Sequence, residues 1–306
     1  MKPRLFAIVG PTASGKTALA LEVAARLPIE IVSCDSQAVY RGLDLGTAKP
    51  TPAERAAAPH HLVDVADPAG AFSAATFVHL ADEAIADIRA RGRIPLVVGG
   101  TGLYLRSLLR GIFEAPPKDE ALRRALEARA EREGSEALHR ELAAVDPRAA
   151  ARIEPADLVR IVRALEVHRL TGRTISEHHE AHAGGAPRYL ATVFGVTPPR
   201  EELARRVERR ARLMFDEGLA DEAAALARDP AVRAKLEGIM GYREALLLAE
   251  GAIGREEAIE RTRLAQRRFA KRQLTWFRAM PEVEWLAWPP SADEVAARIA
   301  ADHAVR

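Results

Sequence analysis

Residues 4–17 read RLFAIVGPTASGKT, and this stretch decides the fold of the N-terminal part of the chain. Residues 4–9 are an apolar run with β-branched members, which predicts a short strand. Residues 10–17 match G-x-x-x-x-G-K-T, and residues 17–27 then carry apolar side chains at helical spacing. In this pattern the glycines let successive backbone N–H groups point at an anion, and the helix adds its positive N-terminal end. The stretch therefore predicts a phosphate-binding loop between a strand and a helix.

The loop supplies two side chains with separate tasks. Lys16 brings a mobile positive charge to the phosphates, and Thr17 offers a hydroxyl to Mg²⁺. The motif does not specify the polyphosphate, for which ATP is the default. The predicted phosphate-binding residues are Gly10, Pro11, Thr12, Ala13, Ser14, Gly15, Lys16 and Thr17.

Further short apolar runs predict four more strands, at residues 29–33, 62–65, 94–98 and 189–196. A helical period covers the stretch before the third of these runs, residues 73–91. Strands that alternate with helices are typical of a parallel sheet with crossover connections. We therefore expect an α/β fold, a parallel sheet that carries the phosphate-binding loop, with helices on both of its faces.

Helical sequence dominates the rest of the chain. Residues 118–183 are charged, rich in alanine and without a convincing strand, and residues 200–278 are again helical and rich in arginine. The residues after Pro289-Pro290 predict a last amphipathic helix. We expect a catalytic core with basic C-terminal helices, residues 1–112 with 187–306, and a helical insertion domain, residues 113–186.

The composition describes a folded protein. Of the 306 residues, 48% are hydrophobic and 29% charged, and the net charge of +2 does not by itself indicate a nucleic-acid partner. The lone cysteine, Cys34, excludes an intramolecular disulfide and a multi-cysteine zinc site, and we expect it to be a small buried hydrophobe. No apolar stretch approaches the roughly 18 residues of a membrane span. We expect a cytoplasmic protein without a signal peptide or membrane contact.

Two residues follow strands at the edge where ligands of such sheets gather. P-loop hydrolases usually have an apolar strand that ends in an acid for Mg²⁺, but here residues 94–98 are followed by Gly99-Gly100-Thr101. The acid at a strand end is Asp35, after residues 29–33. Asp35 and Thr101 are therefore expected to face the phosphate-binding loop. Three roles stay open for Asp35: magnesium ligand, general base or structural cap.

Two arginine-rich stretches have alternative explanations. Residues 261–278 contain seven basic and no acidic residues, with aromatic residues between them, which suits a nucleic-acid strand but also a solvated helix face. In residues 200–212, Arg206 and Arg210 lie four apart and either reach the phosphate pocket or pair with Glu202 and its neighbours. The stretch 177–182, EHHEAH, lacks an H-E-x-x-H pattern and is more typical of an exposed helix end than of a metal site.

Seven motifs together resemble the tRNA dimethylallyltransferase (tRNA isopentenyltransferase) family. They follow the family order and cover nearly the whole chain, which makes the resemblance far more specific than the phosphate-binding loop alone. The motifs are GPTASGKT at 10–17, DSQAVYRGLDLGTAKPT at 35–51, HHLVDVADP at 60–68, VVGGTGLYL at 97–105, RIVRALEV at 160–167, GIMGYRE at 238–244 and RRFAKRQLTWFR at 267–278.

The resemblance implies a reaction and two substrates. The family transfers a dimethylallyl group from dimethylallyl diphosphate to N6 of the adenosine 3′ of the tRNA anticodon, and the loop holds the diphosphate of the donor rather than ATP. Asp35 is then the general base, and Thr101 lies at the bridging oxygen of the leaving diphosphate. Lys16, with Arg206 or Arg210, neutralises the departing charge, and Thr17 helps to hold Mg²⁺. The partners are the tRNA anticodon stem-loop and the prenyl donor, with no obligate protein partner.

The resemblance also implies a set of RNA-contacting residues. Val159 departs from the family, which often has glutamine at this position. The RNA-contacting residues expected from the motifs and the basic stretch are Asp35, Ser36, Gln37, Ala38, Thr101, Arg123, Val159, Arg160, Ile161, Val162, Arg163, Gly238, Gly241, Tyr242, Arg243, Arg267, Arg268, Lys271 and Arg272.

Two other classes of enzyme share part of this pattern. A P-loop kinase of small metabolites would share the loop and Asp35 but has little reason to carry residues 261–278. An isopentenyltransferase that acts on free adenine nucleotides would share Asp35 and Thr101. The basic C-terminal helices, which suit a large polyanion, favour the tRNA enzyme over both. A non-enzymatic RNA-binding ATPase is disfavoured by the missing hydrolase acid.

Overall fold

The structure is a computed structural model that describes residues 2–112, 116, 118–183 and 186–304. The chain divides into two compact units, Met1–Leu109 with Arg188–Arg306, and Arg110–Pro187. Each unit is described by itself. The sequence-based division into a catalytic core, residues 1–112 with 187–306, and an insertion domain, residues 113–186, stays a prediction.

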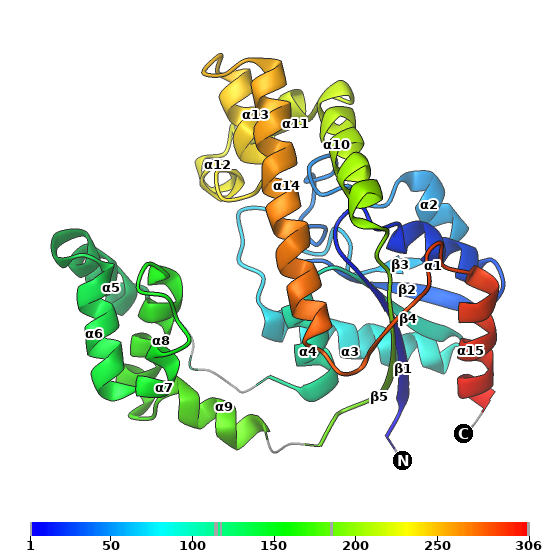
Figure 1. Cartoon of the computed structure of the whole chain (residues 1–306), viewed down its shortest axis with the longest axis horizontal. Helices are drawn as coiled ribbons and strands as arrows, with labels where there is room; N and C mark the ends of the chain where they lie inside the picture. Colours follow the sequence, from blue (N-terminus) through cyan, green and yellow to red (C-terminus); the bar gives the residue numbers. More distant parts are fainter. Residues whose placement is uncertain (1, 113–115, 117, 184–185, 305–306) are drawn as a thin grey trace. The chain divides into compact units, whose positions relative to one another are not determined.

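The larger unit is built on a six-stranded parallel sheet with the order β3-β2-β4-β1-β5-β6 (Figure 1). The central strand β1 pairs with β4 and β5, so the loop that follows β1 opens between the carboxyl ends of its two neighbours. This confirms the predicted fold class. The strands are β1 (Arg4–Val9), β2 (Ile29–Cys34), β3 (His60–His61), β4 (Ile94–Gly99), β5 (Leu190–Gly195) and β6 (Val283–Trp285).

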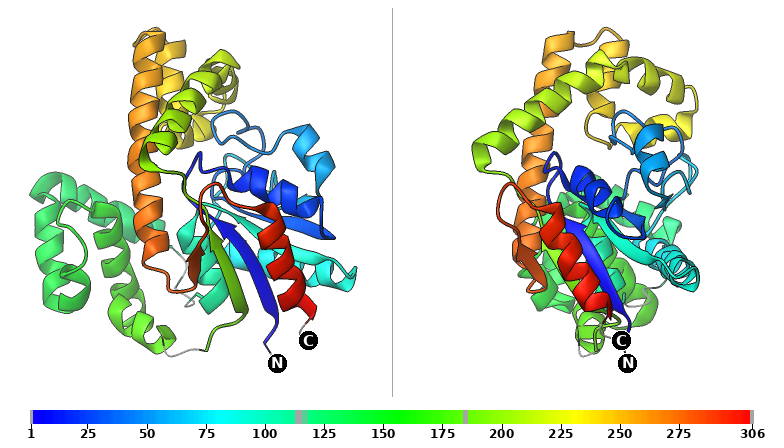
Figure 2. Two further views of the ribbon diagram at one scale, coloured as in Figure 1. Left: turned by 45° about the vertical axis from the view of Figure 1, so that its right-hand side comes forward. Right: turned by 90° about the vertical axis from the view of Figure 1, so that its right-hand side faces the viewer.

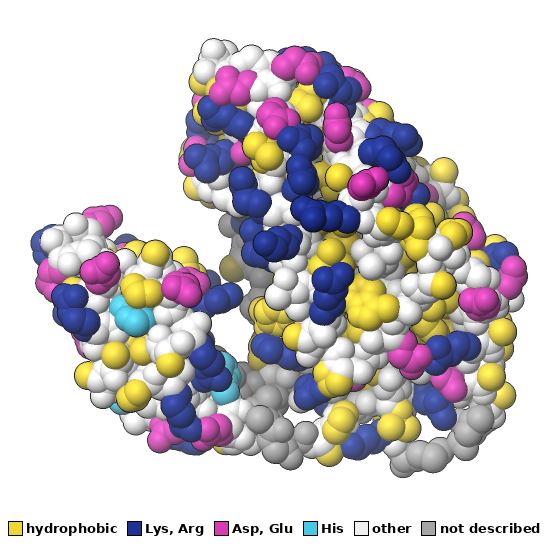
Figure 3. All heavy atoms as spheres, in the orientation of Figure 1, with side chains coloured by type: hydrophobic (Ala, Val, Ile, Leu, Met, Phe, Trp, Pro, Cys, Tyr) yellow, Lys and Arg dark blue, Asp and Glu magenta, His cyan; other side chains and the backbone are white. Residues whose placement is uncertain are grey.

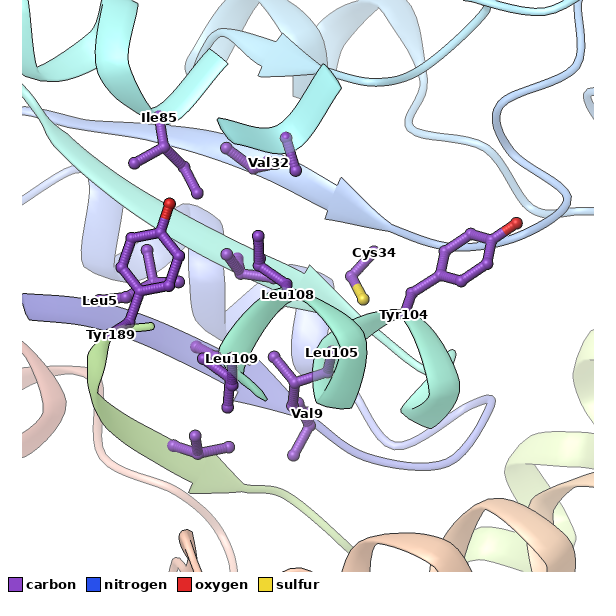
Figure 4. Close-up of a cluster of buried hydrophobic side chains, with 14 of the residues drawn as sticks. Leu5, Val9, Val32, Cys34, Ile85, Tyr104, Leu105, Leu108, Leu109 and Tyr189 are labelled. Atoms are coloured by element: carbon purple, nitrogen blue, oxygen red, sulfur yellow. The ribbon is translucent and has the colours of Figure 1, made fainter. Parts of the chain in front are cut away.

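One face of the sheet is covered by α3 (Ala74–Ala90) and α4 (Gly102–Arg110). Leu105, Leu108 and Leu109 of α4 pack against inward-facing residues of β1 and β2 such as Val9 (Figure 4). Cys34 is fully buried in this cluster, as its sequence context predicted, and burial raises the pKa of its thiol. The α4 packing fixes the short segment between β4 and α4, which contains Thr101.

The opposite face is covered by α1 (Lys16–Ala24) and the C-terminal α15 (Ala292–Ala304), which lie side by side in Figure 2. Leu19 and Val23 of α1 and Val295 and Ile299 of α15 are buried against alternate residues of the strands. The predicted C-terminal helix is confirmed. Since α1 packs against both the sheet and its neighbour α15, its N-terminus is held at the end of β1.

Five helices of the larger unit form a separate hydrophobic cluster with the loop after β2. Val39, Tyr40 and Leu43 of that loop pack against Met214 and Tyr242, among others. The loop after β2 therefore has a helical wall behind it. The helices are α10 (Arg200–Asp216), α11 (Leu219–Leu226), α12 (Pro230–Leu236), α13 (Tyr242–Ala249) and α14 (Arg255–Arg278), with the small α2 (Pro52–Ala57) inside the loop segment.

The smaller unit is helical throughout its described part, as the sequence predicted. Leu126, Leu138, Leu142 and Leu165 form its core. Its helices are α5 (Glu120–Glu133), α6 (Ser135–Val145), α7 (Pro147–Ala150), α8 (Leu158–Thr171) and α9 (Ile175–Ala183). Across the described residues of the whole chain, no helix is long and apolar enough to span a bilayer.

One predicted strand is wrong in its position, and one strand of the structure was not predicted. The third strand is His60–His61 rather than 62–65, because Leu62 and Asp64 have positive φ angles of 62° and 60° that no strand accepts. The backbone of this segment instead bonds to the loop after β2, where Ala66 N donates to Val39 O at 2.8 Å. The three-residue β6 was missed, because it is short and lies between helices.

Candidate active site

The phosphate-binding loop has the backbone that its glycines were expected to permit. Gly15 has a φ of 87°, and a Cβ at Gly10 would lie 2.2 Å from the carbonyl oxygen of Val196. Ala13 also has a positive φ, 63°, so the loop holds a non-glycine residue in the left-handed region. Gly15 caps the N-terminus of α1, and its neighbour Ser14 has a buried hydroxyl that finds no hydrogen-bond partner among the described residues. Unsatisfied donors at a helix N-terminus favour an anion.

The side chain of Lys16 lies against the phosphate-binding loop, and its surroundings lower its pKa. Its Nζ lies 3.3 Å from the carbonyl oxygen of Pro11, to which it donates. Burial disfavours the charged form and the nearby Arg210 repels it, which lowers the pKa of Lys16 to about 8, while Asp35 acts in the opposite direction. An incoming diphosphate would supply the negative charge that this cluster lacks.

The lowered pKa of Lys16 predicts pH-dependent anion binding. Lys16 is a cation below pH 8 and becomes neutral as the pH rises through about 8, so pyrophosphate affinity is expected to fall above that pH. Isothermal titration with pyrophosphate from pH 6.5 to 9.5 measures this. The control is Lys16→Arg, which stays charged over this range and should flatten the fall. An equal fall in both proteins would contradict the assignment.

Asp35 and Thr101 face each other across the ends of β2 and β4. Asp35 Oδ1 accepts hydrogen bonds from Gln37 N at 2.8 Å and Ala38 N at 3.2 Å, while the Thr101 hydroxyl accepts one from Ser36 N at 3.0 Å. Within the described chain, Asp35 Oδ2 therefore keeps its lone pairs. A hydroxyl that accepts from Ser36 still has a proton to donate. The site thus offers a proton acceptor beside a proton donor.

Both arginines of α10 reach the loop, which answers the question that the sequence left open. Arg210 lines the cavities on both sides of Lys16, and burial lowers the pKa of its guanidinium. One terminal nitrogen of Arg210 donates to Thr47 O at 3.3 Å, while its buried Nε has no partner within the described part of the chain. Arg206 lies over the ring of Trp288 and donates to Glu202 at 2.8 Å, and its guanidinium would be 3.3 Å from a Cβ at Gly15. Arg206 therefore lines the larger cavity beside the loop, and it also pairs with Glu202 within α10.

Two cavities meet at the phosphate-binding loop. The first has a volume of about 330 Å³ and is lined by Asp35, Thr101, Phe269 and Gln273, among others. The second has a volume of about 1130 Å³ and lies between the loop, α10 and the segment 41–55. Five residues line both cavities, namely Lys16, Thr17, Ala48, Pro50 and Arg210. Lys16 and Arg210 therefore lie where the two cavities join.

The wall formed by the loop after β2 is fixed by residues that sequence reasoning missed. Lys49 is buried and donates to Asp44 and Asp64, each at 2.6 Å, and to the carbonyl oxygen of Tyr40 at 2.8 Å. From α11, Glu222 accepts from the backbone N–H groups of residues 44 and 45. Such charge-assisted bonds hold a loop in one conformation. Their partners are up to 178 residues apart, so the sequence carried no local signal for them.

The basic stretch 261–278 forms the last three quarters of α14. Arg267, Arg268, Lys271 and Arg272 are exposed and belong to the column of Lys and Arg side chains that Figure 3 shows on this part of the molecule. Among the described residues, Arg268, Lys271 and Arg272 form no ion pair, whereas Arg263 pairs with Glu260. A run of unpaired cations favours the polyanion interpretation over a salt-bridged solvated face. We call the four exposed cations the α14 cation column.

Burial corrects three of the expected RNA contacts. The side chains of Ile161 and Val162 belong to the core of the smaller unit, and Tyr242 is fully buried with its hydroxyl bonded to Glu222. These side chains cannot touch RNA in this structure. Tyr242 packs against Gly46, where a Cβ would lie 2.3 Å from its ring. Gly241, also buried, has a φ of 88° at the N-cap of α13.

Other predicted RNA contacts are accessible. Gly238 and Arg243 are exposed in the larger unit, and Gly238 lines the smaller cavity. In the smaller unit, Val159 is 71% exposed at the start of α8 and Arg160 beside it is also exposed.

Arg123 and Arg163 take part in an ion-pair cluster of the smaller unit. Both contact the carboxylate of the fully buried Glu166, and Arg163 also donates to the carbonyl oxygen of Pro116 at 3.0 Å. Glu166 in addition accepts from the backbone N–H of Asp119 at 2.8 Å. These contacts hold the N-terminus of α5 against α8. The two arginines therefore have a structural role in this unit.

Histidines of both stretches have hydrogen-bond partners within the protein. His60 accepts or donates at Nδ1 with the carbonyl oxygen of Ala58 at 2.8 Å, and burial lowers its pKa. His61 lies 2.7 Å from Glu30, and His178 lies 3.2 Å from the hydroxyl of Thr171. In the part of the chain that the structure describes, no three His, Cys, Asp or Glu residues gather as a metal site.

The chemistry of the donor set nevertheless fits Mg²⁺ bound together with a diphosphate. Mg²⁺ is usually held by one or two protein oxygens plus substrate phosphates and waters, so it needs no cluster of protein ligands. Thr17 lines both cavities next to Lys16, and Asp35 lines the smaller one. The hydroxyl of Thr17 is thus placed to hold the ion, with the carboxylate of Asp35 nearby.

The fold and the site define a P-loop α/β protein whose phosphate site opens beside a carboxylate and a hydroxyl and carries an exposed cation column. A family model described as IPP transferase matches residues 38–280. A tRNA dimethylallyltransferase from Anaeromyxobacter dehalogenans (strain 2CP-C) is 55% identical over 298 residues, 97% of this chain and 99% of that protein. The chain belongs to this family, the IPP transferases, as the motifs indicated.

Solved structures agree with this assignment. A full-length tRNA isopentenylpyrophosphate transferase from Bacillus halodurans superposes with a TM-score of 0.71 at 40% identity, covering 98% of this chain and 96% of that one. A eukaryotic dimethylallyltransferase acting on tRNA superposes with a TM-score of 0.80 at 25% identity, covering 99% of this chain and 79% of that one.

Proposed function

We propose that the protein transfers a dimethylallyl group from dimethylallyl diphosphate to N6 of the adenosine directly 3′ of the tRNA anticodon (adenosine-37) and releases diphosphate. The observation that carries this proposal is the smaller cavity, whose wall contains two cations, Lys16 and Arg210, together with the carboxylate of Asp35 and the hydroxyl of Thr101. An anionic leaving group and a nucleophile that loses a proton need these two sets of groups. Family membership supplies the substrates.

The cations act on the leaving group. As the bond between C1 of the allyl group and the bridging oxygen breaks, its electron pair goes to the diphosphate and positive charge develops on the allyl carbons. Lys16 and Arg210 stabilise the departing negative charge, and the proton of the Thr101 hydroxyl is available to the bridging oxygen. Groups aimed at charge that develops in the transition state give the largest share of most rate enhancements.

Asp35 acts on the nucleophile. The exocyclic amine of adenine is weakly nucleophilic because its lone pair is delocalised into the ring. As N6 forms its bond to C1, a proton of N6 passes to Asp35 Oδ2, whose partner oxygen is held by Gln37 N and Ala38 N. The base leaves the anticodon-loop stack to reach this cavity, and Phe269 in the cavity wall offers a ring for stacking.

Mg²⁺ would be held by Thr17 together with oxygens of the diphosphate. When bound, the ion neutralises charge on the leaving group, as in other P-loop proteins. In this proposal Asp35 serves as the base and not as a primary ligand, so its Oδ2, the oxygen not bonded to Gln37 N and Ala38 N, receives the N6 proton.

The α14 cation column favours tRNA over a free nucleotide as acceptor. Arg272 belongs to the column and also lines the smaller cavity, so the column leads directly to the site. A free nucleotide carries too few phosphates to use the exposed cations one or two helical turns away. An anticodon stem presents a phosphate backbone of matching length.

A transfer assay tests the proposal. Purified protein, Mg²⁺ and labelled dimethylallyl diphosphate are mixed with unmodified tRNA and, in parallel, with AMP. We expect label in tRNA and none in AMP. Label in AMP alone would move the protein to the free-nucleotide class, and no transfer to either acceptor would reject the proposed function.

The cation column predicts a salt-dependent RNA affinity. Replacing both Lys271 and Arg272 with alanine should weaken tRNA binding and make the slope of log K against log salt shallower by about 1 to 2, since each lost phosphate contact removes about 0.7 to 0.9. Binding measured by fluorescence anisotropy at several salt concentrations gives the slope. Arg26→Ala, which removes an ion pair with Asp293 on α15, is the matched control and should leave it unchanged. An unaltered slope in the double variant would mean that the column does not bind RNA.

A further inference from the structure

Gln273 lies on the inward side of the same helix that carries the cation column. Its side chain is buried, 7% exposed, between the phosphate-binding loop and the end of β4. Gln273 Oε1 accepts from Thr12 N at 2.8 Å, and Gln273 Nε2 donates to the carbonyl oxygen of Gly100 at 2.9 Å. A backbone N–H can only donate and a carbonyl can only accept, so these two partners fix the orientation of the amide.

The two bonded groups belong to the two halves of the catalytic site. Thr12 is in the loop that is to hold the diphosphate, and Gly100 immediately precedes Thr101, whose hydroxyl accepts from Ser36 N next to Asp35. Gln273 is 261 residues from Thr12 and 173 from Gly100 in the chain. One side chain of α14 thus connects the phosphate-binding loop to the segment that carries Thr101.

The helix is seated on this segment with no space to slide. A Cβ at Gly100 would lie 2.3 Å from Gln273 Nε2, and a Cβ at Gly102 would lie 2.1 Å from Trp276 Cδ1. A side chain at position 102 would therefore displace the Trp276 ring, and one at position 100 would displace the amide of Gln273. A small displacement of α14 must break the bonds of Gln273 or carry the loop with it.

Two residues of the α14 cation column precede Gln273 in the chain. Lys271 and Arg272 directly precede it and are exposed, and among the described residues neither forms an ion pair. RNA bound at the column therefore acts on the helix one residue away from the side chain that holds Thr12. A ligand that restrains α14 also restrains the loop, and a ligand that orders the loop also restrains α14.

We propose that Gln273 is a positioning residue that couples RNA binding on α14 to diphosphate binding at the phosphate-binding loop. The proposal relies on the proposed function only for the identity of the two ligands. Gln273 lines the smaller cavity, but its amide is bonded to Thr12 N and Gly100 O, and in this proposal it acts through those two groups. It sets the loop conformation through Thr12 and the position of Thr101 through Gly100, so each substrate is bound more tightly when the other is present.

The coupling is measured with the full-length protein and two ligands that do not react. Pyrophosphate affinity is determined by isothermal titration with Mg²⁺, alone and in the presence of saturating unmodified anticodon stem-loop RNA. For the wild-type protein we expect the RNA to raise pyrophosphate affinity about 5-fold or more, within the usual range of allosteric coupling. By linkage, pyrophosphate must raise RNA affinity by the same factor, which is an internal check.

Gln273→Met keeps the size of the side chain and removes both hydrogen bonds. We expect the coupling factor to fall to less than about 2-fold, while the affinity for RNA alone and its salt dependence stay near wild type because the column is intact. Thr275→Ala is the matched control, since Thr275 is exposed on the same helix and, among the residues that the structure describes, its hydroxyl bonds only to Lys271 O. It should keep the wild-type coupling.

Gln273→Glu provides a second variant if the methionine variant does not fold. Glutamate keeps an acceptor for Thr12 N but cannot donate to Gly100 O, so its coupling should also be reduced. A coupling factor of one in the wild-type protein would overturn the proposal, as would equal coupling in the wild type and the Gln273 variants, or an equal loss in Thr275→Ala. Label transfer by the wild-type protein is measured separately, so failure of the proposal is distinguishable from failure of the proposed function.

Discussion

Asp35→Asn should lower kcat for transfer by about 10²- to 10⁴-fold, the usual contribution of a positioned general base. Asparagine keeps a carbonyl oxygen for Gln37 N and Ala38 N, so the turn after β2 is preserved, but an amide cannot take the proton of N6. The affinities for pyrophosphate and for tRNA should therefore stay within a few-fold of wild type. Single-turnover transfer and separate binding titrations measure the two effects.

A comparison with Asp35→Ala separates the chemical role of Asp35 from its structural role. Alanine removes the acceptor of both backbone N–H groups as well as the base, so it should also disturb the turn and reduce tRNA affinity. If asparagine were nearly as active as aspartate, Asp35 would be a turn-capping residue and the base would have to be sought elsewhere. Equal losses of turnover and binding in Asp35→Asn would assign it to RNA contact.

Arg210→Gln should lower kcat/KM by about 10²- to 10³-fold, comparable to the removal of one donor from an oxyanion site. Arg210 is partly buried at the junction of the two cavities. One of its terminal nitrogens donates to Thr47 O, and its Nε has no partner in the described chain, so Nε is available to the diphosphate. The expected loss is larger in transfer than in pyrophosphate binding if the cation acts mainly on charge that develops in the transition state.

The neighbouring Arg209 offers a matched control for this prediction. Arg209 is exposed on the same helix and lines neither cavity, so Arg209→Gln removes the same charge from α10 without touching the site. It should retain near wild-type transfer. Similar losses in the two variants would show that the general charge of α10 matters, and not the position of Arg210 in the cavity wall.

The part of the site that could be predicted from the sequence is the part encoded locally. The phosphate-binding loop is contiguous, and Asp35 and Thr101 each follow a strand, so parallel-sheet geometry alone brings them together. Charge pattern indicated the face of α14, and the absence of nearby acids left Lys271 and Arg272 unpaired.

The rest of the site depends on contacts between residues that are far apart in the chain. Glu222 and Gln273 hold the site through backbone groups on other elements, and Lys49 is buried by the fold of a loop with no periodic pattern. The predicted strand at 62–65 failed because left-handed residues and ion pairs of Asp64 override the apolar run. Tyr242 looked like an RNA contact because its motif is contiguous, but packing against Gly46 places its ring in the core.

The central claim is that the protein alkylates the exocyclic amine of one adenosine in tRNA. The most direct measurement uses two anticodon stem-loops that differ only in the base 3′ of the anticodon, adenine in one and hypoxanthine in the other, which lacks the exocyclic amine. After incubation with dimethylallyl diphosphate and Mg²⁺, nucleoside mass analysis locates the product. We expect N6-dimethylallyladenosine at that position, one diphosphate released per transfer, and no product with hypoxanthine. Prenylation of the hypoxanthine RNA, or of any other position, would contradict the account.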